Sequence, residues 1–201
     1  MKFLDGGAPP GRARFLDDAD NDDDTRRVQN ARIAEYALAA ADYVRQSLKV
    51  ELDGSVESLA FVDHYLSKVG NISDEVLALL SAAIGCYFGE LVIGKLGGEW
   101  RTEGDDPAGW TVMLEAAPIT FHPVAMAAEA VRQADLEDYD AGIQVPANME
   151  GPLEEALAAV GDVEADYYYS LTGRLETLEH VAEVLAELRR QAQEETDKTR
   201  N

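Results

Sequence analysis

The chain has 201 residues, of which 46% are hydrophobic and 28% are charged, so it can form one domain with a sizeable core. Lys and Arg total 17 against 39 Asp and Glu, which gives a formal net charge of −22. Such a charge repels nucleic-acid phosphates and anionic lipid, and it argues against nucleic-acid binding and membrane-surface binding. The same charge suits solubility alone, or attraction of a basic protein partner.

Cysteine usage and the first residues bear on the compartment. Cys86 is the only cysteine, so an intrachain disulfide and a four-cysteine zinc site are both excluded. The first seven residues contain no apolar stretch of the kind that opens a secretion signal. We therefore expect a cytoplasmic protein.

The first 24 residues combine glycine and proline with a block of aspartates. Like charges and turn formers cannot bury enough apolar surface to order, so we expect a flexible acidic arm over residues 1–24. After this arm we expect a single domain over residues 25–196 and a disordered tail over residues 197–201. Asp18, Asp20 and Asp22 imitate the opening of a calcium loop, but Asp23 and Gln29 occupy the positions that need Gly and Glu. We expect no metal site.

Two amphipathic helices are predicted next. From about Thr25, apolar residues recur at three- and four-residue steps from Val28 through Ile33 to Leu48, and Asp53–Gly54 ends this pattern. A second helix is expected from Ser55, which suits an N-cap, to Gly70.

Residues from Ser73 to about Leu96 predict a third, central helix. No charge separates Glu75 from Glu90 and apolar residues lie on every side, which indicates burial in a core. The length also fits a membrane span, but Glu90 and the absence of flanking basic residues argue against one. Ser81, Gly85 and Gly89 form a small-residue stripe where another helix can approach closely.

The C-terminal half begins with the clearest β pattern. Strands are expected from Trp100, over residues 110–114 and over 119–121, followed by a short helix from Pro123 to about Arg132. Residues 134–151 are expected to be an irregular acidic connection. A helix is then expected from Pro152 to near Gly161. A last helix of about 20 residues follows, with leucines at near-heptad spacing. The fold class expected is α+β, mainly α: a helical bundle around a buried central helix, with a small antiparallel β-meander.

Glu90 is the first candidate site residue. It shares a helix face with Cys86 and Tyr87, so we expect its carboxylate to be half buried. Buried carboxylates need partners or shifted pKa values, and such groups concentrate at functional sites. The alternative interpretation is a structural pair with Arg101 or with a backbone donor.

Aromatic residues and one histidine complete the candidate binding residues. Trp100 and Trp110 bracket the meander turn, and His122 precedes Pro123 where it could cap a helix. Tyr167 and Tyr168 belong to a run of three tyrosines that cannot all face one core, so at least one should be exposed or covered by a partner. No catalytic motif or nucleotide-binding loop is present, and we expect no catalytic residues and no cofactor.

The segments Gly85–Glu90 and Leu96–Trp100, followed by the meander and by residues 121–123, resemble a pattern in small bacterial domains of unknown function. Some of those domains are similar to immunity proteins encoded beside secreted toxins. The resemblance covers residues 55–133. It implies a helical domain with a small sheet that binds another protein, and it carries over no catalytic residues.

The sequence therefore predicts a non-catalytic cytoplasmic protein-binding domain, immunity-like in type, that engages a basic partner. Two alternatives stay open. One is an enzyme with a pocket around Glu90, helped by His122 or Tyr87; the other is a homodimer formed through the last helix.

Overall fold

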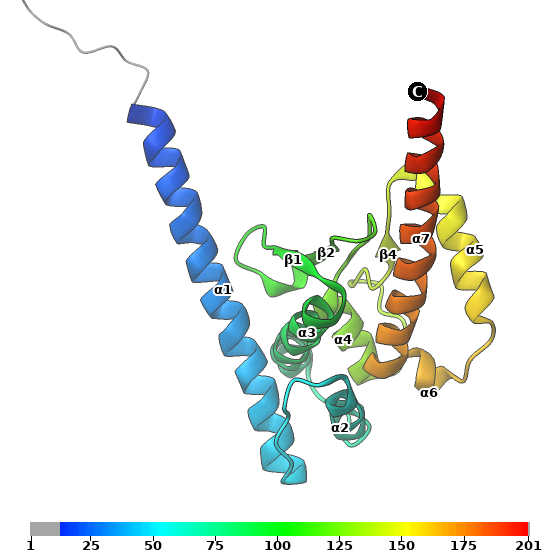
Figure 1. The fold of residues 1–201 in the computed structure, drawn as a ribbon. Coiled ribbons are helices and arrows are strands. Elements are labelled where there is room, and N and C mark those ends of the chain that lie inside the picture. The colour runs from blue at the N-terminus through cyan, green and yellow to red at the C-terminus, as the bar shows by residue number, and fades with distance from the viewer. Residues whose placement is uncertain (1–12, 201) are drawn as a thin grey trace, which may run out of the picture.

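The computed structural model describes residues 13–200, and it describes side chains from Thr25 to Glu194. Short 3-10 turns occupy residues 56–58, 107–109 and 147–149. The helices are α1 (Ala13–Leu48), α2 (Leu59–Leu66), α3 (Asp74–Leu96), α4 (Pro123–Arg132), α5 (Glu150–Val160), α6 (Ala165–Tyr168) and α7 (Leu171–Arg200). One antiparallel sheet has the order β1 (Gly98–Arg101), β2 (Thr111–Leu114), β3 (Thr120–Phe121) and β4 (Ile143–Gln144). The expected mainly helical α+β fold is confirmed (Figure 1).

Helix α3 is the centre of the fold. Ser73 caps it, since its Oγ accepts from Val76 N at 3.4 Å, and Gly97 ends it in a left-handed conformation with φ of 72°. Within the described residues, α3 alone is long and apolar enough to cross a membrane, but 72% of its apolar window is buried inside the fold. The helix lies between α1 and α4 (Figure 1), as expected for a core helix.

The small-residue stripe of α3 admits two close neighbours. A Cβ added at Gly85 would lie 2.5 Å from Val124 Cα, so the backbone of α4 rests directly on this glycine. A Cβ added at Gly89 would overlap the indole of Trp100. The expectation of a close helix approach is confirmed at Gly85, while Gly89 accommodates a side chain from β1.

Helix α1 packs along α3 through Ile33, Ala40 and Val44, which are all buried. Val28 was expected on this face but is 60% exposed. The helix begins at Ala13 instead of about Thr25, so part of the expected acidic arm is helical. Once the packed part of a helix has formed, adding a further turn costs little free energy, because the nucleus already exists. Helix α1 accordingly extends past the sheet (Figure 1). Residues 1–12 lie outside the described range.

The sheet contains the expected meander and one additional strand. β1 pairs with β2 so that Trp100 lies opposite Val112, and β2 pairs with β3 so that Val112 lies opposite Phe121. β4 comes from the acidic connection that was expected to be irregular, and pairs with β3. β1 and β4 are therefore the two edges of the sheet.

Helix α7 closes the domain. Asp63 on α2 caps it: one carboxylate oxygen accepts from Leu171 N at 2.8 Å, and the other from Thr172 N at 3.1 Å and Thr172 Oγ1 at 2.6 Å. Its leucine seam is buried within the chain as far as Leu185. The helix continues to Arg200, beyond the expected 20 residues and through most of the expected tail.

Candidate functional site

Glu90 and Trp100 meet between α3 and β1. Trp100 Nε1 donates to Glu90 Oε1 at 2.8 Å, because the missing side chain at Gly89 lets the indole lie on α3. Glu90 is exposed, so the expectation of a half-buried carboxylate was wrong. The expected pairing with Arg101 was also wrong, since Arg101 Nη2 binds Glu99 Oε1 at 2.5 Å.

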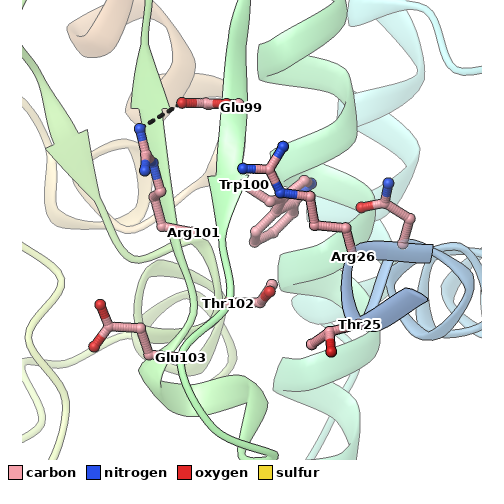
Figure 2. A pocket seen from close by; sticks show the side chains of 8 residues that line it. Thr25, Arg26, Glu99, Trp100, Arg101, Thr102 and Glu103 are labelled. Atoms are coloured by element: carbon pink, nitrogen blue, oxygen red, sulfur yellow. Dashed lines mark hydrogen bonds and ion pairs between the residues drawn. The ribbon is translucent and has the colours of Figure 1, made fainter. Parts of the chain in front are cut away.

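A cleft of about 370 Å³ opens between α1 and the free edge of β1 (Figure 2). Arg26 on α1 and Trp100 on β1 extend toward one another across it, and the dashed contact in Figure 2 joins Glu99 to Arg101. The cleft is lined by Thr25, Arg26, Asn30 and residues 99–103. Its charges are of both signs, so it does not select strongly for one charge of ligand.

A second, more apolar groove of about 460 Å³ runs between α1 and α3. It is lined by Ala34, Ala37, Leu38, Ala41, Leu52, Gly54, Tyr87, Glu90 and Leu91. Tyr87 shares a hydrogen bond of 2.6 Å with Ser58 Oγ, and burial raises the pKa of its hydroxyl. Glu90 and Tyr87 thus line the same groove, with the Glu90 carboxylate oriented by Trp100.

Trp110 is fully buried, so the expectation that it forms part of a binding surface was wrong. Its Nε1 donates to Gly104 O at 3.3 Å, Tyr36 packs edge-on against its ring, and the Arg32 guanidinium lies 5.2 Å from the ring centroid. Arg32 is held over the indole by Asp105, with 2.9 Å between Nη1 and Oδ1. The role of Trp110 is therefore to attach the β1–β2 loop to α1.

Cys86 belongs to the same buried cluster as Trp110. Burial, with a smaller contribution from the negative charge of Glu90, raises the pKa of the thiol to about 12. A thiol of this kind stays protonated at neutral pH and is a poor nucleophile, which makes Cys86 a packing residue.

His122 makes no hydrogen bond to Glu90 among the described residues. It immediately precedes α4, but its side chain makes no capping hydrogen bond, so the expected capping role was wrong. Its Nε2 lies 3.5 Å from Gln144 Nε2, beside the β3–β4 pair. His122 and Glu90 therefore have different hydrogen-bond partners, Gln144 and Trp100.

The tyrosine run lies on the side of the fold that carries α6 and α7. Tyr167 is 39% and Tyr168 47% exposed, which confirms that the run cannot be wholly buried. The Tyr167 hydroxyl donates to Glu176 on α7. The Tyr168 ring lies 4.5 Å from the Arg174 guanidinium carbon, and Tyr169 donates to Asp135 Oδ1 at 3.1 Å.

Beneath these tyrosines lies an ion pair that the sequence interpretation missed. Arg174 Nη2 contacts Glu129 Oε2 at 2.6 Å, with 12% and 7% of the two side chains exposed. Burial raises the pKa of Glu129, and the positive charge of Arg174 opposes that rise. A signal was present: Arg174 is the only Lys or Arg between Arg132 and Arg189, and Glu129 is the only acidic residue in the α4 segment.

Among the residues whose side chains are described, no group of three His, Cys, Asp or Glu is placed to hold a metal ion. The candidate surfaces are two: the side that carries the tyrosine run, and the groove between α1 and α3 that Glu90 lines.

Comparison with protein-family models, with curated proteins and with solved structures finds no match to this chain.

Proposed function

We propose that this chain is a non-catalytic, acidic, cytoplasmic domain that binds a basic protein partner. The observation that carries the proposal is where the negative charge lies. The formal net charge is −22, and Glu129 is the only buried carboxylate among residues 25–194. Because the other described carboxylates reach the surface, a basic partner would be attracted over a long range, and a phosphate backbone would be repelled.

The charge is also unevenly distributed along the chain. Between Gln133 and Gly173 there are ten Asp or Glu residues and no Lys, Arg or His. This segment provides β4, α5 and α6. The support for a basic partner is thus concentrated on one part of the molecule.

An immunity-type role is one form of this function, in which the basic partner is a toxin. It follows from the resemblance over residues 55–133 and needs no catalytic group in this chain. The genes beside its own would test that role directly, since a toxin gene there is the expected arrangement.

An enzyme with a pocket around Glu90 has weaker support. Glu90 lines the groove between α1 and α3 together with Tyr87, but the Tyr87 hydroxyl already bonds to Ser58, and His122 lies beside Gln144. A homodimer through α7 has weaker support as well, because the leucine seam is used inside the chain as far as Leu185.

The test is affinity capture on the immobilised chain, beside a control column carrying an unrelated protein of the same net charge. We expect a basic protein that is retained by this chain alone at about 50 mM NaCl and released at about 500 mM. With the purified partner, the association rate constant should fall as salt increases. Retention of the same proteins on both columns, or an association rate independent of salt, would overturn the proposal.

A further inference from the structure

Five partly exposed apolar side chains lie within twelve residues at the end of α5, in the following connection and on α6. They are 38% to 47% exposed, and we call them the tyrosine face: Leu157, Val160, Val163, Tyr167 and Tyr168. Leu157 and Tyr168 lie together, because both line one cavity, and the other three are their neighbours in sequence. Exposed apolar groups that gather on a surface are typical of protein–protein contact sites.

A small cavity of about 140 Å³ opens beside this face. Leu157 and Tyr168 of the tyrosine face line it, together with Met126, Ala141, Gly142, Ile143, Arg174 and Thr177. Its walls come from α4, β4, α5, α6 and α7, so it is held by packed elements instead of by one loop. A cavity of this kind can take one apolar side chain of a partner, which is how the energetic centre of an interface is commonly built.

Five of the residues that line the cavity belong to a segment whose charge is of one sign. Within the acidic segment 133–173, no basic residue offsets the ten carboxylates, and the nearest cation in sequence, Arg174, is held by Glu129. Arg174 Nε is buried and has no hydrogen-bond acceptor among the described residues. A partner for this face must therefore bring positive charge around an apolar anchor.

We propose that the tyrosine face and its cavity form the docking site for a basic amphipathic helix of the partner. One aliphatic side chain enters the cavity, and Lys and Arg residues beside it contact the carboxylates of α5 and α6. This inference rests on the proposed function, because it assigns the basic partner to a particular surface.

The probe is a fluorescent helical peptide of about 18 residues with Lys on one face and Leu on the other, and the control is a peptide of the same composition in scrambled order. Anisotropy is measured at about 50 mM NaCl. We expect the amphipathic peptide to bind more tightly than the scrambled one, because only the first presents an apolar anchor and a basic rim together.

The decisive variant is Leu157→Asp, with Leu79→Asp as its matched control. Both substitutions add one negative charge at an exposed leucine, but Leu79 is on α3, away from α5 (Figure 1), and lines none of the cavities described above. If apolar contact in the cavity anchors the peptide, Leu157→Asp weakens binding about tenfold, whereas Leu79→Asp leaves it within about twofold. Circular dichroism checks that both variants fold.

Three results would overturn the docking site: absence of peptide binding, equal binding of the scrambled peptide, or equal effects of the two variants. None of them would disturb the proposed function if the capture experiment still returned a basic partner. For a readout that needs no substitution, backbone NMR shifts on adding the peptide should concentrate at Leu157, Val163 and Tyr168. Shifts confined to α1 would place the contact elsewhere.

Discussion

Replacing Arg174 by methionine keeps a long apolar side chain but removes the charge that pairs with Glu129. The Glu129 carboxylate, 7% exposed, would then retain only the weak contact from Leu136 N at 3.4 Å. Breaking a buried pair by removing one partner typically costs about 3–5 kcal/mol. We expect the lower end, about 3 kcal/mol, because the Arg174 side chain keeps 12% of its surface exposed.

The pH dependence follows from the raised pKa of Glu129. An acid whose pKa is raised in the folded state contributes stability that is fully present below its unfolded pKa and is lost as the pH rises through its folded pKa. In Arg174→Met the opposing effect of the arginine is gone, so this pKa should rise further. The stability loss should therefore be larger at about pH 8 than at about pH 5.

The assay is urea unfolding at both pH values, followed by circular dichroism. Arg45→Met is the control, because Arg45 forms an exposed pair with Asp42 that should contribute little. The double variant Arg174→Met/Glu129→Gln should recover most of the loss, since no unpaired charge stays buried. A loss below about 1 kcal/mol, or a loss equal at both pH values, would refute the argument from a buried charge.

Three further predictions follow from local packing. Gly85→Ala should destabilise the fold by about 1–3 kcal/mol, because the new methyl group would meet the backbone at Val124. The control Gly94→Ala has no atom within 4 Å of the new methyl group, so in the same urea assay its stability should be equal or slightly higher. Cys86 should react with a thiol reagent at about pH 8 only as fast as the protein unfolds, and rapid labelling of the native protein would contradict its burial. Asp63→Ala should cost about 1–2 kcal/mol by removing the cap of α7, and a thermal midpoint equal to that of the native chain would show that the cap contributes nothing.

Several elements were predictable because their signals are local. Helix α3 could be placed from Ser73 to Gly97 because its cap, its lack of charge and its terminal glycine are all adjacent in the chain. The close approach at Gly85 was likewise visible as a small residue on an apolar helix. Strand β4 was not, since two residues of strand in an acidic connection give no periodic pattern.

The candidate site was harder to predict because it depends on which side of α3 faces solvent and on which side chains pack against its glycines. Sequence spacing placed Glu90 beside Cys86 and Tyr87, but the packing of Trp100 on Gly89 turns the carboxylate toward solvent, where it accepts the indole N–H. Trp110 looked equivalent to Trp100 in sequence, yet it is fully buried, with Ile33 and Tyr36 of α1 on one side and Cys86 of α3 in the same cluster.

The amino-acid sequence by itself determined the mainly helical class, the central position of α3 and the excess of negative charge. Charge is a sum over residues, and a helix and its buried side can be read from the spacing of apolar residues that are close in the chain. Only the tertiary structure decided the partners of individual polar groups. Asp63 caps α7 from 108 residues away, and Arg174 finds Glu129 from 45 residues away. Such pairs form because burying a polar group without a partner is costly, and the available partner is known only once the helices have packed.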